Sequence, residues 1–157
     1  MGKTQVSYLR YIVSAQGVAA DLAKVQALID WLSPANLKEL QGFLGLTGYY
    51  RKFVAGYAIT LPLTEQLKKD CFWSNNEVEK AFNELKKAMI SIPVLALPNF
   101  TKEFIVKTDA FEFGLGIVLL QDERPVAFFS QTLGPQARLK PIYEKELMTI
   151  VYAVIRW

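Results

Sequence analysis

The hydrophobic residues of positions 19–93 recur at intervals of three and four, the spacing of helices that bury one face. Polar residues that can accept hydrogen bonds from a helix N-terminus precede these runs, and two of them open capping-box patterns. The predicted helices cover Asp21 to Leu32, Asn36 to about Tyr50, Leu61 to Lys69, and Ser74 to about Ser91. The pattern therefore predicts a mainly helical region in this part of the chain.

Residues that favour extended structure lie on both sides of the helical region. Residues 6–13 followed by a turn at 15–17 indicate a strand or hairpin. Beyond a proline-bracketed segment at 93–98, three short β-type runs predict an antiparallel meander at 104–108, 115–120 and 125–130. Residues 142–157 are apolar on nearly every side, which predicts a helix buried on more than one face. The expected fold class is α+β.

Composition narrows the chemistry that the chain can perform. Of its 157 residues 52% are hydrophobic, yet no apolar run reaches the ~20 residues of a membrane span, and no signal-peptide pattern opens the chain. We therefore expect a soluble intracellular protein without a membrane partner. The absence of histidine excludes Ser-His and Cys-His nucleophile pairs and His-ligated metals, while a single cysteine excludes an internal disulfide.

Two carboxylates are candidates for a catalytic metal site. Asp109 ends a predicted strand, and Glu146 lies within the apolar C-terminal helix. Carboxylates on two rigid elements can share a Mg²⁺ or Mn²⁺ ion, which prefers oxygen ligands. The structural alternative is an aspartate that starts a turn and a solvated helical glutamate, and the spacing alone favours that alternative.

The helical region also holds candidate nucleic-acid contacts. Residues 1–93, which include this region, carry the whole net charge of +3. Aromatic and cationic side chains alternate at Tyr49, Tyr50, Arg51 and Lys52, a pattern that suits base stacking and phosphate contact, although a packed helix end explains it equally well. Lys68 and Lys69 add positive charge or form an ordinary solvated helix end.

A glycine series at positions 42, 45 and 48 superficially resembles a nucleotide-binding loop. No strand precedes it and helix-forming residues surround it, so phosphate binding there is not expected. Close approach between helices is the favoured explanation.

Several longer motifs closely resemble the reverse transcriptase polyprotein of gypsy-type LTR retrotransposons. They are YLRYIVSAQGV at 8–18, NLKELQGFLGLTGYYRKF at 36–53, PVLALP at 93–98, KTDA at 107–110, PVAFFS at 125–130 and YEKEL at 143–147. The resemblance implies an end-of-palm hairpin at 1–18, a helical thumb-like region at 19–93 and a partial RNase H-like domain at 94–157. It also implies that Asp109 and Glu146 correspond to the first two metal-binding carboxylates of RNase H.

Other features of the family are missing or altered. The chain has no Asp-Asp pair of the kind that the polymerase uses, and it ends before the later RNase H aspartates. Phe111 and Glu112 follow Asp109 where the family has small residues, and Arg10 stands where it usually has glycine. We therefore expect a protein whose ancestral polymerase and ribonuclease activities are absent when it acts alone, and which binds divalent metal weakly.

The resemblance implies binding to an RNA/DNA hybrid or a duplex as the main function. The alternatives are Mg²⁺-dependent ribonuclease H cleavage of the RNA strand of such a hybrid, and a domesticated structural or interaction role without nucleic acid. A fourth strand that pairs with the first is also missing, so a homodimer through residues 94–157 is a further expectation.

Overall fold

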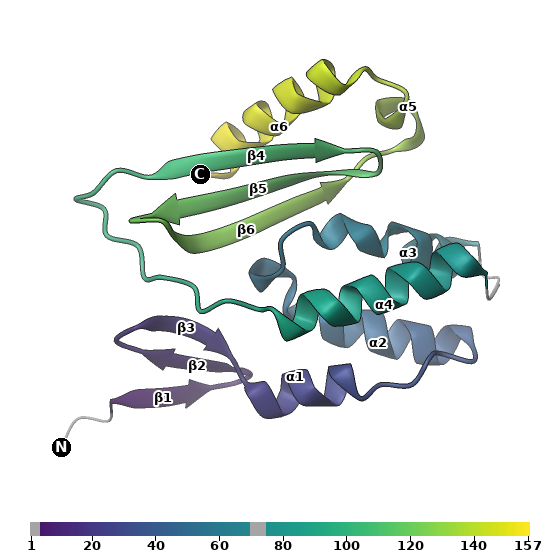
Figure 1. Ribbon diagram of the computed structural model, residues 1–157, viewed down its shortest axis with the longest axis horizontal. Helices are drawn as coiled ribbons and strands as arrows, with labels where there is room; N and C mark the ends of the chain where they lie inside the picture. Colours follow the sequence, from purple (N-terminus) through teal and green to yellow (C-terminus); the bar gives the residue numbers. More distant parts are fainter. Residues whose placement is uncertain (1–3, 70–74) are drawn as a thin grey trace.

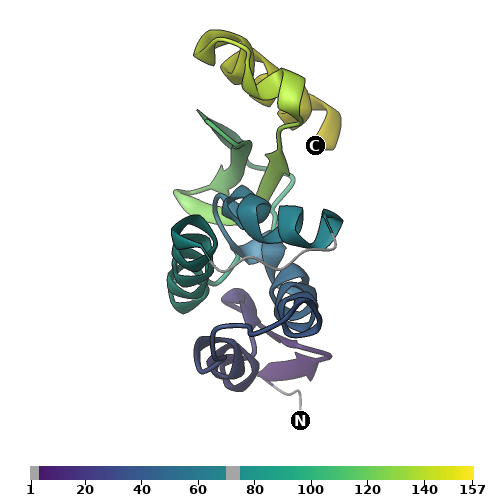
Figure 2. The ribbon, with the colours of Figure 1, turned by 90° about the vertical axis from the view of Figure 1, so that its right-hand side faces the viewer.

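The computed structural model describes residues 4–69 and 75–157. Within them the chain forms a small N-terminal sheet, a group of helices and a second sheet with a long helix across it (Figure 1). The N-terminus lies beside the first sheet, and the C-terminus lies next to the second sheet at the opposite end of the molecule (Figures 1 and 2). The arrangement confirms the predicted α+β class.

The N-terminal sheet has three strands where the sequence predicted a strand or a hairpin. Its antiparallel strands follow each other in the order β1 (Gln5–Tyr8), β2 (Tyr11–Ser14) and β3 (Gly17–Ala20). The predicted extended segment is interrupted by a turn at Leu9, whose φ is +56°. The turn predicted before Gly17 joins the second and third strands.

The helical region contains the four predicted helices and two short 3-10 turns that the periodicity did not reveal. The elements are α1 (Leu22–Ile29), α2 (Leu37–Tyr49), η1 (Arg51–Phe53), η2 (Tyr57–Thr60), α3 (Leu61–Lys68) and α4 (Asn76–Ile90). The first helix ends three residues earlier than predicted, and Leu32 is 83% exposed. Leu32 therefore takes no part in the core.

Side-chain caps fix where three helices begin. Asp21 Oδ1 accepts a hydrogen bond from Ala23 N at 3.0 Å, and Asn36 Oδ1 accepts one from Glu39 N at 2.9 Å, as the patterns predicted. The fourth helix is capped by Asn75, whose Oδ1 accepts from Val78 N at 2.8 Å. Ser74, the predicted cap of that helix, lies outside the described residues.

Large aromatic and aliphatic side chains form the core between these helices. The rings of Phe43 and Phe82 lie 4.6 Å apart, and Leu63 and Leu85 are fully buried beside them. Each buried side chain of this size contributes about 1.5–3 kcal/mol relative to exposure. The core therefore holds the two long helices α2 and α4 in fixed positions.

The second sheet is the antiparallel meander that the sequence predicted, with longer strands. Its order is β4 (Ile105–Phe111), β5 (Gly114–Gln121) and β6 (Arg124–Thr132). A short helix α5 (Pro135–Arg138), which the sequence did not predict, leads into α6 (Ile142–Arg156). Helix α6 packs mainly on β4, at one edge of the sheet (Figure 1).

The prediction that the last helix is buried on more than one face was wrong. Only Lys145, Thr149 and Ala153 are buried, at intervals of four residues that define one face. Its outward side remains apolar, with Val154 77% exposed and Ile155 75% exposed. The cause is that α6 packs against the sheet along one side, and the described residues place no element over its other sides.

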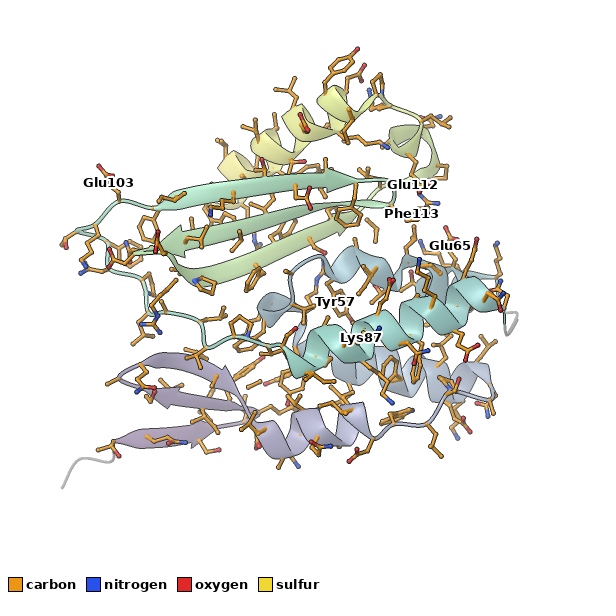
Figure 3. The ribbon with its side chains drawn as sticks, in the orientation of Figure 1. Tyr57, Glu65, Lys87, Glu103, Glu112 and Phe113 are labelled. Carbon is orange, nitrogen blue, oxygen red and sulfur yellow. The ribbon has the colours of Figure 1, made fainter. Side chains whose placement is uncertain are left out.

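Arginine side chains join the helical region to the second sheet. Arg51 Nη2 donates to the carbonyl oxygen of Ser130 at 2.7 Å. Arg138 pairs with Glu65 at 2.9 Å, and Glu65 and Phe113 lie at the same end of this junction (Figure 3). A backbone bridge between Val18 and Leu95 ties the first sheet to the connecting segment. These contacts hold the two halves together along the length of the junction.

Candidate nucleic-acid interface

Two tyrosines and two cations form a stack where β2 meets the end of α2. The rings of Tyr11 and Tyr49 are stacked, with centroids 5.1 Å apart and planes 13° from parallel. The guanidinium of Arg10 lies 5.1 Å from the Tyr49 ring centroid, and Lys52 Nζ lies 3.9 Å from that of Tyr11. Both distances are within the range of cation–π attraction. We call these four residues the tyrosine–cation stack.

Each member of the tyrosine–cation stack is positioned by a different local element. Arg10 lies in the turn before β2, Tyr11 begins β2, Tyr49 ends α2, and Lys52 lies in η1. The Tyr11 hydroxyl donates to the Tyr49 carbonyl oxygen at 3.3 Å, which fixes the strand against the helix end. The stack is therefore built from rigid elements.

Burial raises the pKa of the Tyr11 hydroxyl above its ordinary value. The hydroxyl consequently stays protonated and uncharged at neutral pH. The Tyr11 side chain therefore places no negative charge beside Lys52 and does not reduce the positive potential of the stack.

The positive charges near this stack are those of Arg10, Arg51 and Lys52. No ion pair formed by residues 4–69 and 75–157 includes Arg10, Arg51 or Lys52. Arg51 and Lys52 are exposed to solvent, while Arg10 is partly exposed. Cations without an ion-pair partner beside aromatic rings are suited to phosphate contact and base stacking.

The six residues predicted to contact nucleic acid do not form one surface in the structure. Tyr49 and Lys52 lie in the tyrosine–cation stack, and Arg51 lies next to it with one nitrogen bound to Ser130. Lys68 and Lys69 are exposed at the end of α3. Tyr50 is 0% exposed, so it is a core residue and offers no ring to a base.

The prediction that Tyr50 contacts nucleic acid failed because the side chains of two successive residues at the end of α2 differ in burial. Tyr49 stacks on Tyr11 and stays partly exposed, whereas Tyr50 packs edge-on against both of these rings and is fully buried. Sequence reasoning also missed the role of Arg10. Two features of the sequence pointed to Arg10: it precedes Tyr11 directly, and it stands where the family that the chain resembles usually has glycine.

Asp109 lies on β4, opposite Gly116 of β5, and is exposed. With Lys107 and Phe111 it lines a small cavity of about 140 Å³ that Ala55 and Gly56 close from the helical region. The neighbouring strand residue Val106 lines the groove beneath α6 instead, and Thr108 borders both spaces. Alternation along the strand thus directs Asp109 to the face toward the helical region.

Glu146 is exposed on α6, beside the buried Lys145. Among the described residues there is no group of three or more His, Cys, Asp or Glu side chains that could hold a metal ion. Two exposed carboxylates supply only part of the shell of a hard divalent cation. The residues described here therefore do not make a complete Mg²⁺ site.

The glycine series lies inside α2 and forms no phosphate-binding loop. A Cβ at Gly42 would contact Trp31 at 3.7 Å, and one at Gly48 would lie 3.6 Å from the Tyr57 hydroxyl. Gly45 has no such neighbour within 4 Å in the described part of the chain. Two of the three glycines thus face neighbouring side chains at contact distance.

No helix within the described ranges is long and apolar enough to cross a membrane.

Comparison with curated proteins finds retrotransposon polyproteins. The chain is 41% identical over 154 residues to the retrovirus-related Pol polyprotein from transposon 297 of Drosophila melanogaster, a match that covers 96% of this chain and 14% of that protein. It is 48% identical over 109 residues to an uncharacterized mitochondrial protein of Arabidopsis thaliana, covering 68% of this chain and 69% of that protein. The chain thus spans about a seventh of the length of the transposon 297 polyprotein.

Solved structures with the same fold come from foamy virus. The foamy viral protease-reverse transcriptase in complex with RNA/DNA hybrid matches 98% of this chain with a TM-score of 0.83 at 22% identity, over 22% of that chain. The same protein in complex with double-stranded DNA also matches 98% of this chain with a TM-score of 0.83. At this identity the match establishes the fold.

A family model described as the RNase H-like domain found in reverse transcriptase matches residues 73–157, more than half of the chain. Together with the transposon relatives, this match shows that the chain belongs to the RNase H-like reverse transcriptase family of retrotransposon polyproteins.

Proposed function

We propose that this chain is part of a gypsy-type LTR retrotransposon reverse transcriptase and that it binds RNA/DNA hybrid or duplex nucleic acid where its helical region meets the N-terminal sheet. The observation that carries the proposal is the tyrosine–cation stack, in which Arg10 lies over the Tyr49 ring and Lys52 over the Tyr11 ring, and neither cation forms an ion pair with a described residue. Contacts of this kind reach phosphates and are independent of base sequence.

The surroundings of the stack support the proposal. Arg51 follows Tyr50 directly and keeps a full positive charge while one of its nitrogens binds the Ser130 carbonyl. It therefore adds charge close to the stack and also fixes the position of the second sheet. The foamy virus reverse transcriptase with the same fold was solved with hybrid and duplex bound, which is consistent with this use of the fold.

Fluorescence anisotropy with a labelled RNA/DNA hybrid tests the proposal. Lys52→Gln and Arg10→Gln should each weaken binding uniformly across sequences and lower the slope of log affinity against log salt by about 1. Lys87→Gln provides a matched control, because Lys87 is exposed on α4 and has no place in the stack (Figure 3). Equal affinities for the stack variants and the wild type would contradict the proposal.

Mg²⁺-dependent cleavage of the RNA strand is the second candidate function. It rests on the resemblance of Asp109 and Glu146 to the first two metal-binding carboxylates of RNase H. Asp109 itself faces the helical region, on the side of the sheet away from α6. Two carboxylates alone leave the cation shell incomplete, so cleavage would need ligands from elsewhere. A hybrid-cleavage assay with Asp109→Asn and Glu146→Gln separates this function from binding, since both variants should bind hybrid normally.

A further inference from the structure

One short turn at the end of α2 sends three consecutive side chains in three directions. The turn is η1, a 3-10 helix with about three residues per turn, so its successive side chains leave about 120° apart. Lys52 reaches the tyrosine–cation stack, where its Nζ lies 3.9 Å from the Tyr11 ring centroid. Phe53 is 0% exposed and enters the core, and Arg51 Nη2 donates to the carbonyl oxygen of Ser130 at 2.7 Å. The turn therefore connects the stack, the core and the second sheet.

The Arg51 side chain is held at two places. Besides its hydrogen bond to Ser130, its guanidinium lies 5.8 Å from the ring centroid of Tyr57, within the range of cation–π attraction. The hydroxyls of Tyr57 and Thr47 are hydrogen-bonded at 2.9 Å, and both residues are buried, so the ring beside the guanidinium is fixed. Arg51 therefore reaches β6 in one preset orientation.

Ser130 begins a row of three residues that crosses the second sheet. In the strand registers, Ser130 of β6 lies opposite Gly116 of β5, and Gly116 lies opposite Asp109 of β4. We call these three residues the Asp109 row. Neighbouring strands are about 4.8 Å apart, so Asp109 lies about 10 Å from Ser130 across the sheet. A contact that fixes Ser130 therefore also fixes the line on which Asp109 lies.

The Asp109 row faces the helical region. The Phe129 ring stacks on Tyr152 of α6 with centroids 6.5 Å apart, so alternation along β6 directs the neighbouring Ser130 side chain to the opposite face. Ser130 is 5% exposed, and the other two residues of the row line the cavity of about 140 Å³ that residues 55–56 close from the helical region. The whole row therefore lies against the segment that begins with η1.

We propose that Arg51 is a positioning residue that holds the Asp109 row at a fixed place relative to the tyrosine–cation stack. Its hydrogen bond to Ser130 keeps the second sheet docked on the helical region. Because Arg51 and Lys52 are consecutive residues of one turn, docking of the row and binding of nucleic acid at the stack stabilise each other, and such a coupling is reciprocal. The coupling rests on the proposed function, whereas the positioning by Arg51 does not.

The labelling rate of a buried thiol measures how often the junction opens. In a Cys71→Ser background, Ser130→Cys places a thiol on the face toward the helical region and keeps the backbone carbonyl that Arg51 binds. A thiol reagent reaches this position when the sheet leaves the helical region. Arg51→Gln removes a hydrogen bond from a charged donor, so it should raise the labelling rate about tenfold to a hundredfold. Lys87→Gln, an exposed position on α4, should leave the rate unchanged.

A second thiol separates positioning from general destabilisation. Thr149 is 0% exposed where α6 packs on the sheet, so Thr149→Cys in the same background reports on that face. Arg51→Gln should leave its labelling rate unchanged, because Arg51 contacts β6 from the helical region. Circular dichroism verifies that each variant folds. If Arg51→Gln does not fold, Arg51→Lys replaces it; this variant keeps the charge but loses the planar fork of donors, and should speed labelling of Ser130→Cys less strongly.

A saturating RNA/DNA hybrid tests the coupling. Bound hybrid, verified by anisotropy, should slow labelling of Ser130→Cys about fivefold or more, and Arg51→Gln should abolish this slowing. The positioning is overturned if the Arg51 variant labels Ser130→Cys no faster than the chain with Arg51, or if labelling at the two thiol positions accelerates equally. Bound hybrid that does not slow labelling overturns the coupling. A hybrid that does not bind contradicts both the proposed function and the coupling, while the Arg51 variant still decides the positioning.

Discussion

Gly114 lies where the second sheet packs closely against the helical region, so replacing it with alanine tests how tightly the two halves fit. A Cβ at this position would lie 2.4 Å from Ala58 Cβ and 2.9 Å from the Gln131 carbonyl oxygen. Ala58 lies in η2 and is 2% exposed, so it has no free space into which to move. Carbon atoms in contact prefer 3.5–4.0 Å, which means that the halves must separate by about 1 Å.

Overpacking of this kind costs about 1–3 kcal/mol of unfolding free energy. For a chain of this length each kcal/mol lowers the melting temperature by about 2–4 °C. We therefore expect Gly114→Ala to lower the unfolding free energy measured in urea and the melting temperature measured in thermal denaturation. Gly45→Ala is the matched control, because no described residue lies within 4 Å of its added Cβ. In the interior of α2 that change should stabilise by up to about 1 kcal/mol.

A second substitution identifies the contact responsible. Ala58→Gly removes the methyl group that Gly114→Ala would strike, so the double variant should be more stable than the sum of the single effects by about 1 kcal/mol. Strict additivity would show that the two positions do not interact. A Gly114→Ala variant as stable as the wild type would refute the packing geometry itself.

Three further predictions concern the first sheet, the core and the metal ligands. Gly17→Ala should destabilise strongly in urea denaturation, because Gly17 has a φ of +136° and its Cβ would lie 2.0 Å from the Leu95 carbonyl oxygen; an unchanged midpoint would contradict this. Tyr50→Phe should raise the unfolding free energy by about 1 kcal/mol, because no described residue hydrogen-bonds the buried Tyr50 hydroxyl. Burial also raises the pKa of the Tyr50 hydroxyl, so this group ionises less readily in the folded chain than in the unfolded chain. The unfolding free energy of the wild type therefore falls as the pH rises above about 10. Above about pH 10 the Tyr50→Phe variant should therefore lose less unfolding free energy than the wild type. An equally steep loss in the two proteins would contradict the burial of the Tyr50 hydroxyl. Calorimetry should find Mg²⁺ and Mn²⁺ binding much weaker than micromolar, since Asp109 and Glu146 supply too few ligands; tight binding that Asp109→Asn abolishes would show otherwise.

Local sequence patterns predicted most of the elements. The caps at Asp21 and Asn36 and the helical spacing after them placed α1 and α2, because these signals act within one or two turns of the chain. The meander followed from short β-type runs separated by turns. The bounds differ because tertiary pairing extends strands beyond the residues with strong β preference, as at Phe111 and Thr132.

The candidate site was only partly predictable, because it depends on contacts between distant residues. Tyr49 and Lys52 belonged to a visible motif, but the partners that arrange them, Tyr11 and Arg10, lie almost forty residues earlier. The same reason explains the error at Tyr50, whose inward orientation is set by the core. The exposed side of α6 was misjudged because apolar composition indicates what a helix could bury and does not show which neighbours are present.

The most direct test of the central claim is the salt dependence of RNA/DNA hybrid binding by the wild type and by the Arg10→Gln, Lys52→Gln double variant. If the tyrosine–cation stack contacts phosphates at both ends, wild-type affinity falls steeply between 50 and 200 mM salt, and the double variant has a slope lower by about 1.8, or about 0.9 for each lost phosphate contact. Identical slopes for the two proteins, or a wild-type affinity that does not change with salt, would contradict nucleic-acid binding through this stack.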